Sequence, residues 1–140
     1  MTVKILVCSD KHFASWVIRI GTMSKWSHVG IAFGDVVFDT MLKTGVNIQS
    51  LTEFKSKHTH IEEIEIDIPD ESAAYDFALA QIGKKYDWTA LVGMVIQRNW
   101  QETDSWFCSE LVEAIIKAGG KQRFRSDVSR ITPHQTWAIL

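Results

Sequence analysis

Cysteine is scarce in this sequence, and the scarcity excludes several classes of protein. The 140 residues include two cysteines, Cys8 and Cys108, which are too few for a disulfide framework. They also lack the CxxC spacing that marks zinc sites and redox sites. We therefore expect two free thiols in a reducing compartment, which favours a cytoplasmic protein.

Long apolar runs are missing as well. The first apolar run, residues 3–7, is too short for the core of a signal peptide. No stretch reaches the roughly 18 to 20 apolar residues that a membrane-spanning helix requires. The sequence therefore predicts neither a membrane span nor an export signal, and a function outside the cell would require lysis or another export route.

Neither charge of one sign nor low-complexity sequence dominates the chain. Fifteen basic residues oppose 17 acidic ones, the net charge is −2, and no basic run marks a nucleic-acid-binding face. Only two prolines are present, and no repeat or linker divides the chain. With 46% hydrophobic residues, a chain of this length can bury a sizeable core. We expect residues 1–140 to form one domain without a nucleic-acid partner, and the pattern favours no particular oligomeric state.

The hydrophobic pattern predicts an α+β fold. The segments with the character of strands are residues 3–7, 26–33, 36–41, 45–51 and 61–68. The segments with the character of helices are residues 11–23, about 70–82, 88–97, 105–118 and 133–140. Because most strands precede most helices, this order indicates an α+β fold rather than a parallel sheet of βαβ units.

A tight hairpin is the clearest local signal. Residues 34–35, a Gly-Asp pair, separate two β-rich runs and fit a two-residue turn. Such a turn would pair Phe33 with Val36 and would place Asp39 diagonal to His28 on one face of the hairpin. An imidazole in this otherwise apolar strand needs hydrogen-bond partners. Asp39 is therefore a candidate partner of His28, although a histidine in a strand is more often structural than catalytic.

Cys108 lies in the first turn of the helix expected at residues 105–118. The free N–H groups and the partial positive charge at a helix N-terminus favour a thiolate over a thiol. The backbone N–H of Cys108 is also a natural donor to a developing oxyanion. Most cysteines are instead small buried hydrophobes. Together, however, Cys108, His28 and Asp39 supply the nucleophile, the base and the orienting carboxylate that a thiol hydrolase needs.

Three segments resemble one superfamily of cysteine hydrolases. They are Trp-Ser-His-Val-Gly-Ile at residues 26–31, Gly-Lys-Lys-Tyr-Asp-Trp at 83–88 and Phe-Cys-Ser-Glu-Leu-Val at 107–112. Across residues 3–120 the chain resembles the circularly permuted NlpC-type papain-like superfamily, which includes YiiX-like bacterial proteins and relatives of lecithin:retinol acyltransferase. The histidine strand of that superfamily precedes its cysteine helix. The resemblance implies a papain-like domain with an antiparallel β-sheet packed against helices.

The resemblance also implies roles for individual residues. Cys108 would be the nucleophile and His28 the general base. The third polar residue of the family lies on the following strand, where Asp39 falls, and a shift of one residue would select Thr40 instead. Tyr86 matches the tyrosine of the family's Gly-x-x-Tyr segment, where its hydroxyl could help to hold the substrate carbonyl. A half-buried aromatic residue without that role is the alternative.

Other side chains near these residues have possible functions. Three of them flank the proposed site and are candidates for a substrate groove, namely Trp26, Ser27 and Trp106. Most tryptophans nevertheless belong to a core. His58, His60 and Glu62 alternate along one strand face and could bind a divalent metal ion. Adjacent strand residues seldom converge on one ion, so a solvated strand end is the simpler interpretation, and we expect neither a metal ion nor a cofactor.

These features predict a cysteine hydrolase that forms a thioester acyl-enzyme on an amide or ester. The resemblance implies a small peptide or acyl substrate, such as a bacterial cell-wall peptide or an acyl lipid, in a bacterium or a bacteriophage. We favour a peptidase or amidase, because the long hydrophobic tail of the lipid-processing relatives is missing. Two alternatives stay open: a non-catalytic module that binds a peptide or lipid in the same fold, and a lipid acyltransferase or thioesterase.

Overall fold

A computed structural model describes residues 1–9, 25–41, 43–87, 105–125 and 131–139. Its strands and helices are β1 (Thr2–Ser9), β2 (His28–Phe33), β3 (Val36–Met41), β4 (Gly45–Ser50), α2 (Leu51–Lys57), β5 (His60–Asp67), α3 (Glu71–Gln81), β6 (Lys85–Tyr86), β7 (Ser105–Trp106), α5 (Cys108–Ala118) and α6 (Pro133–Ala138). The helices expected at residues 11–23 and 88–97 lie outside the described residues. Among the helices that are described, none combines the length and the hydrophobicity needed to cross a lipid bilayer.

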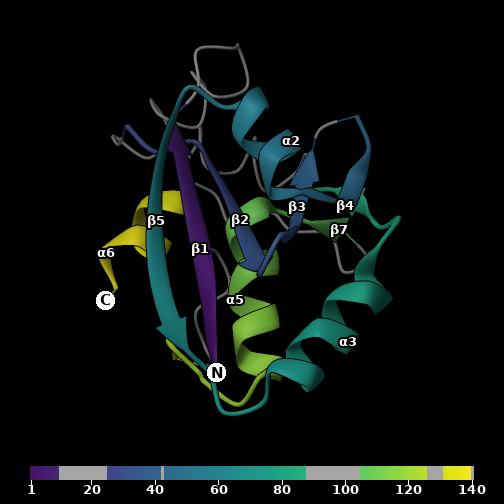
Figure 1. Cartoon of the computed structure of the whole chain (residues 1–140), viewed down its shortest axis with the longest axis vertical. Coiled ribbons are helices and arrows are strands. Elements are labelled where there is room, and N and C mark those ends of the chain that lie inside the picture. Colours follow the sequence, from purple (N-terminus) through teal and green to yellow (C-terminus); the bar gives the residue numbers. More distant parts are fainter. Residues whose placement is uncertain (10–24, 42, 88–104, 126–130, 140) are drawn as a thin grey trace.

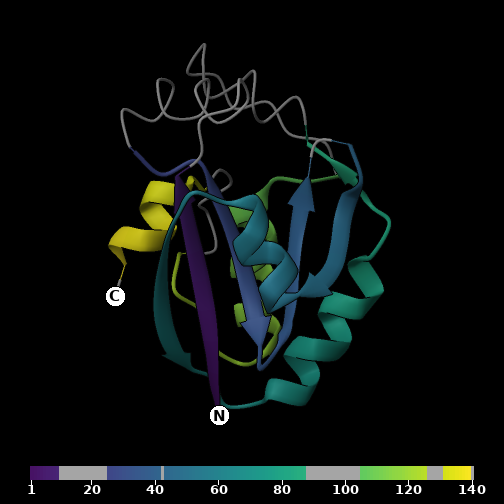
Figure 2. The same ribbon diagram turned by 45° about the horizontal axis from the view of Figure 1, so that its top comes forward.

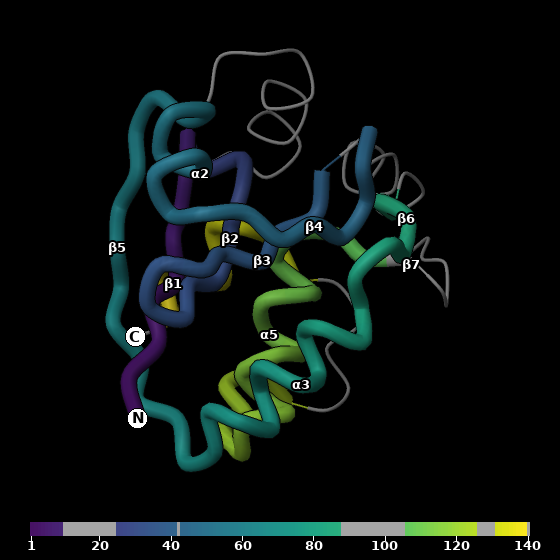
Figure 3. The backbone as a smooth tube through the Cα atoms, turned by 45° about the vertical axis from the view of Figure 1, so that its right-hand side comes forward, coloured from purple at the N-terminus to yellow at the C-terminus, as the bar shows by residue number. Residues whose placement is uncertain are grey.

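A five-stranded antiparallel sheet forms the centre of the fold, in the order β4-β3-β2-β1-β5 (Figure 1). Helix α5 packs against β2 and β3, and α3 and α6 pack against α5, so that these helices cover one face of the sheet. Helix α2 contacts β3 and β4 from the opposite face, as Figure 3 shows. The predicted α+β class and the antiparallel sheet packed against helices are confirmed.

Strands β2 and β3 form the predicted hairpin. Phe33 pairs with Val36 and Ile31 pairs with Phe38, which is the register expected from a two-residue turn. Gly34 in that turn has a φ of 59°, in the left-handed region that glycine adopts without steric cost. Because side chains alternate along a strand, this register decides which residues of both strands face α2.

The larger core lies between the sheet and helices α3 and α5. It includes fully buried side chains from the strands and from α5, among them Ile5, Ile31, Phe38, Leu111 and Ile115. Full burial of a side chain of this size contributes roughly 1.5–3 kcal/mol. The apolar stripe of α5 therefore holds the helix across β2 and β3, and its first turn lies at the end of the sheet where β2 begins (Figure 1).

A second, smaller cluster lies on the opposite face, beneath α2. Its buried members are Leu6, Cys8, Ala32, Val37 and Phe54. The strand expected at residues 45–51 ends at Ser50, and α2 begins at the next residue. The Ser50 hydroxyl accepts a hydrogen bond from the backbone N–H of Glu53 at 3.1 Å. The Ser-x-x-Glu capping pattern was therefore the sequence signal for this helix, which the strand prediction overlooked.

Helix α5 begins later than the sequence predicts. The helix expected at residues 105–118 starts at Cys108 instead. The two residues of β7, 105–106, are extended and pair in parallel with β6. The backbone N–H of Asp87 donates a hydrogen bond to the carbonyl oxygen of Trp106 at 3.1 Å. The chain is thus held extended until shortly before the helix, and Cys108 becomes the first helical residue.

The other helix ends follow the sequence pattern. The Asp70 side chain caps α3 by accepting a hydrogen bond from the N–H of Ala73 at 2.9 Å. Gly120, with a φ of 89°, follows the end of α5. Thr132 and Gln135 form a reciprocal capping box at the start of α6.

A close backbone approach joins β4 to the segment before β6. The N–H of Val46 donates to the carbonyl oxygen of Lys84 at 2.7 Å, and the N–H of Gly83 donates to the carbonyl oxygen of Val46 at 3.1 Å. Gly45 has a φ of 67°, and a Cβ atom at this position would overlap the Lys84 carbonyl oxygen. Only glycine therefore fits at position 45, and this approach fixes where β6 starts.

The packing of α5 predicts a large effect from truncating a core residue. Ile115 is 0% exposed, whereas Leu79 on α3 is 42% exposed. Ile115→Ala should lower the free energy of unfolding by about 2–5 kcal/mol, because the substitution leaves a cavity. Leu79→Ala should change it by less than about 0.5 kcal/mol. Urea unfolding followed by circular dichroism measures both values, and equal losses in the two variants would contradict this account of the core.

Candidate active site

His28 and Asp39 form a buried pair on neighbouring strands. His28 is the first residue of β2 and is 8% exposed, and Asp39 lies on β3 and is 0% exposed. The imidazole Nε2 lies 2.9 Å from the carboxylate Oδ2. The hydrogen-bond partner that the hairpin register predicts for His28 is therefore present.

The second oxygen of Asp39 is bound by a side chain that the sequence prediction missed. Gln49 on β4 donates from Nε2 to Oδ1 of Asp39 at 3.1 Å, and Lys57 at the end of α2 donates from Nζ to Oε1 of Gln49 at 3.0 Å. A buried carboxylate requires such donors. Gln49 lies opposite Val37 in the β3–β4 register and so faces the same side as Asp39. The β3–β4 register could have predicted Gln49 as a partner of Asp39, but the sequence alone did not establish how β4 pairs with β3.

Aromatic rings support the imidazole from the side of α2. The His28 ring stacks on the His58 ring, with centroids 5.0 Å apart and planes 17° apart. Phe54 lies behind both rings, with centroids 6.1 Å from His28 and 4.4 Å from His58. The stacked rings and the bond to Asp39 together restrict rotation of the His28 side chain.

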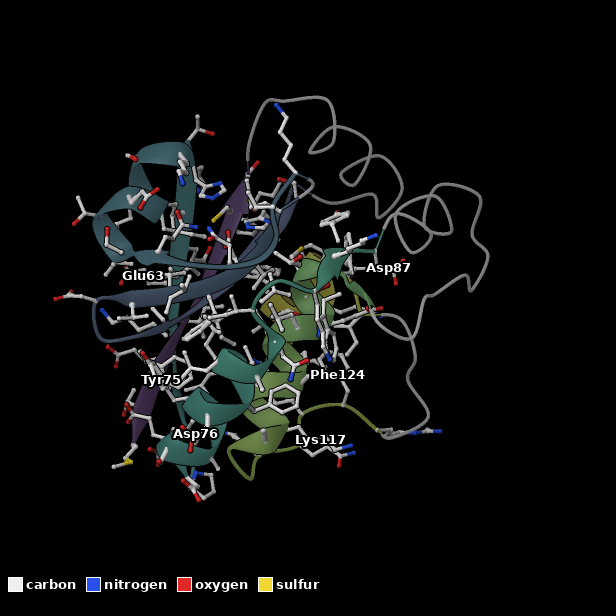
Figure 4. All side chains as sticks on the ribbon, turned by 90° about the vertical axis from the view of Figure 1, so that its right-hand side faces the viewer. Glu63, Tyr75, Asp76, Asp87, Lys117 and Phe124 are labelled. Atoms are coloured by element: carbon white, nitrogen blue, oxygen red, sulfur yellow. The ribbon has the colours of Figure 1, made fainter. Side chains whose placement is uncertain are left out.

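Cys108 is the first residue of α5 and is buried. Among the described residues, no side chain caps this helix, so the N–H groups of its first turn are not satisfied by a capping side chain. Figure 4 shows the labelled Asp87 near the first turn of α5 and Lys117 near the last. Cys108 is one of the groups that raise the pKa of His28, so the two side chains lie near one another.

The pKa of His28 reflects these neighbours. Burial alone lowers it, because burial disfavours the charged imidazolium. The hydrogen bond to Asp39, followed by the hydrogen bond and the charge of Cys108, more than offsets that effect and raises the pKa from 6.5 to about 10. The imidazole is therefore protonated at neutral pH.

Tyr86 lies on β6, beside the first turn of α5. Its buried ring makes an edge contact with Phe107, with centroids 5.7 Å apart. Burial raises the pKa of Tyr86 well above its usual value, and the negative charges of Cys108, Asp87 and Glu110 raise it further. The phenol hydroxyl therefore stays protonated and able to donate a hydrogen bond near Cys108.

Thr40 and Trp106 fix the chain just before the cysteine. The Thr40 hydroxyl donates to the carbonyl oxygen of Trp106 at 3.4 Å, so Thr40 faces β7 while Asp39 faces His28. The half-buried Trp106 indole donates from Nε1 to Oε1 of Gln81 at 3.1 Å. Trp106 thus lies between the start of α5 and the end of α3.

Trp26 and Ser27 precede His28 and are both buried. The Trp26 ring is fully buried and lies against His60 and Trp137, with both centroid distances at 5.8 Å. The backbone N–H of Ser27 donates to the carbonyl oxygen of Cys8 at 2.9 Å. Both residues therefore fix the entry of the chain into β2, and the Trp26 ring belongs to the core.

The histidines that alternate in the sequence do not gather around one point. His58 is the buried C-cap of α2, His60 is exposed at the start of β5, and Glu62 accepts a hydrogen bond from Nε1 of Trp137 at 3.0 Å. A different group among the described residues could hold a metal ion: the donor atoms of His28, Asp39 and His58 all lie within 4.8 Å of one another.

Comparison with known proteins identifies the family. A family model described as "Permuted papain-like amidase enzyme, YaeF/YiiX, C92 family" matches residues 2–129. No curated protein matches the chain. The matched region contains both strands of the hairpin and the whole of α5, and it agrees with the circularly permuted papain-like resemblance noted from the sequence.

Removal of the Asp39 charge should lower the pKa of His28. Asp39→Asn keeps the size of the side chain but weakens the bond that stabilises the protonated imidazole. We expect a shift toward the ordinary histidine value in an NMR titration of the His28 ring protons. Asp35→Asn, in the exposed hairpin turn, is the matched control and should leave the titration unchanged. An unchanged His28 titration in Asp39→Asn would contradict the proposed cause of the shift.

The raised pKa also predicts how stability depends on pH. The pKa of His28 is about 10 in the folded protein and 6.5 in its ordinary state. The stabilising contribution is therefore complete below about pH 6.5 and is lost as the pH rises through about 10. The difference in unfolding free energy between the unmodified protein and His28→Gln should shrink over this interval in urea titrations. A difference that grows with pH would show that the pKa is lowered instead.

Proposed function

The chain belongs to the permuted papain-like amidases of the YaeF/YiiX type, and we propose that it is a cysteine amidase with Cys108 as nucleophile and His28 as general acid and base. The observation that carries this proposal is the buried imidazole between two partners, the Asp39 carboxylate at Nε2 and the Cys108 sulfur. A base held by a carboxylate beside a nucleophile is the arrangement that nucleophilic catalysis requires.

The proposed reaction starts from a thiolate and an imidazolium. The Cys108 thiolate attacks the carbonyl carbon of the amide, a C–S bond forms, and the carbonyl oxygen takes up the negative charge. The N–H groups of the first turn of α5 stabilise this oxyanion, because no side chain among the described residues caps them. The protonated hydroxyl of Tyr86, whose pKa responds to the charge of Cys108, is the further donor in this proposal.

The amine then leaves. The imidazolium of His28 gives the proton on Nδ1 to the departing nitrogen, the C–N bond breaks, and a thioester on Cys108 remains. Asp39 keeps the second ring proton on Nε2, so the neutral imidazole has its lone pair on Nδ1, directed at the reacting atoms. Asp39 is therefore a positioning residue. We assign this role to Asp39 and not to Thr40, because the Thr40 hydroxyl is bound to the carbonyl oxygen of Trp106.

Water completes the cycle. Nδ1 of His28 takes a proton from a water molecule as the water oxygen attacks the thioester carbonyl, the C–S bond breaks, and the carboxylic acid leaves. The thiolate and the imidazolium are restored. The raised pKa of His28 supports this assignment, since the resting state then already holds the proton that the amine receives.

An amide is the proposed substrate class, because the family is described as amidases. Short peptides of the bacterial cell-wall type are the first candidates. The half-buried Trp106 and the hydroxyl of Tyr86 are the proposed substrate contacts. Trp26 and Ser27 act indirectly, by holding the start of β2.

Thiol reactivity tests the nucleophile. The protein is treated with iodoacetamide between about pH 5 and 9, and the labelled cysteines are mapped by mass spectrometry. Cys8 is as deeply buried as Cys108 and serves as the internal reference. Faster labelling of Cys108 than of Cys8 at acidic pH, lost in His28→Ala, is the expected result. Labelling of Cys108 no faster than Cys8 would favour a module that binds without catalysis.

Activity tests the reaction. The purified protein is screened against cell-wall peptides, acyl lipids and simple thioesters. Cys108→Ala should reduce turnover by at least about a thousandfold. Asp39→Asn should lower kcat by at least about tenfold, while Thr40→Val should retain most of the activity. Turnover that survives in Cys108→Ala would exclude Cys108 as the nucleophile. Turnover of acyl lipids alone would show that the substrate is an ester and not an amide.

A further inference from the structure

We propose that His28, Asp39 and His58 form a binding site for a divalent transition-metal ion of the zinc type, and that occupation of this site inhibits the enzyme. The binding stands on the geometry of these three residues, whereas the inhibition rests on the proposed function of His28. The donor atoms of all three lie within 4.8 Å of one another, and all three residues are buried. They come from β2, from β3 and from the residue that follows α2.

The donor set suits zinc better than magnesium or calcium. Imidazole nitrogen and one carboxylate oxygen are common zinc ligands, at about 2.0–2.2 Å from the metal. Magnesium and calcium prefer sites made of oxygen atoms. Two ligands of a tetrahedral ion are about 3.3 Å apart, so the 2.9 Å between His28 Nε2 and Asp39 Oδ2 has to widen slightly, while donor atoms as far apart as 4.8 Å have to approach by roughly 1–2 Å.

The contraction requires one ring to turn. The planes of His28 and His58 are only 17° apart, so both nitrogens cannot point at one ion from stacked rings. His28 is fixed by its bond to Asp39, whereas His58 lies at the end of a short helix. The Cβ–Cγ torsion of histidine is intrinsically broad, and the His58 ring packs against His28 and Phe54 without the bond to Asp39 that fixes His28. His58 is therefore the ligand that moves onto the ion.

The carboxylate is already oriented for such an ion. Gln49 binds Oδ1 of Asp39, which leaves Oδ2 as the oxygen next to Nε2 of His28. Hydrogen bonds of this kind to a ligand strengthen metal sites by fixing its orientation. The positive charge of Lys57 lies beyond Gln49 and is paired with Glu53 at 2.7 Å, so it opposes a cation only weakly.

The ion and a proton compete for the same nitrogen. A metal ion on Nε2 of His28 releases the proton that otherwise lies between Nε2 and Asp39. The imidazole then holds its only proton on Nδ1, toward Cys108. After giving that proton away it would become an imidazolate, so it cannot serve as the neutral base that the second half of the reaction needs. Metal binding thus blocks the base without touching the sulfur.

The binding is tested in the Cys108→Ser variant, which removes the thiolate as a competing ligand. Calorimetry with zinc chloride should give one ion per chain, and cobalt chloride should produce the visible absorption of a tetrahedral site. His58→Gln should weaken binding by at least about tenfold. His60→Gln is the matched control, because His60 is exposed and lies two residues away, and it should bind as Cys108→Ser does.

The inhibition is tested on protein that retains Cys108. Each variant is compared with its own rate without metal, and His58→Gln should need at least about tenfold more zinc for half-inhibition than His60→Gln. Equal sensitivity of both variants would place the inhibitory zinc on the thiolate and overturn the proposal.

A measurement without the His58 variant covers the case in which that variant misfolds. X-ray absorption at the zinc edge of the Cys108→Ser protein should show two imidazole ligands, and a shell with fewer than two would overturn the proposal. If no substrate is turned over, the proposed function and the inhibition fail together, and the calorimetry still decides the metal site. If turnover is found but no ion binds Cys108→Ser stoichiometrically, the metal site alone fails.

Discussion

The fold and its site depend on one buried negative charge, the Asp39 carboxylate. A carboxylate inside a protein is tolerated only when donors surround it, and here each oxygen has one, from His28 and from Gln49. The two donors come from the strands on either side of β3. The same contacts therefore link β2, β3 and β4, and the one to His28 holds the imidazole and raises its pKa. A change in the register of either strand would leave one oxygen of the buried carboxylate without its donor.

Much of the fold and half of the site followed from local sequence. The two-residue turn at Gly34 predicted the register of the hairpin, and that register placed Asp39 within reach of His28 as a candidate partner, which the structure shows bound to it. Short apolar runs and, in β5, alternating hydrophobicity predicted the long strands, and the acidic first turn after Pro69 predicted α3. These predictions succeeded because each rests on neighbours a few residues apart, where backbone geometry leaves few choices. The family resemblance then connected the hairpin with Cys108, which lies far from it in the sequence.

The remaining features depend on contacts between distant segments. Gln49 and His58 acquire their places only when β4 and α2 fold back over the hairpin, so neither residue was predicted as part of the site. The late start of α5 has a similar cause, since β6 holds the preceding residues extended. The position of Trp26 beside His28 suggested a substrate contact, and in the structure its ring is fully buried beside Trp137 of α6.

The glycine at position 45 has a consequence for association between copies of the chain. The outer edge of a sheet exposes unpaired backbone groups that can template another strand. At β4, the segment around Lys84 occupies part of that edge, since Val46 exchanges two hydrogen bonds with it (Figure 2). A larger residue at Gly45 would push this segment away. Such a variant would therefore expose backbone N–H and C=O groups of β4 that could pair with a strand of another copy.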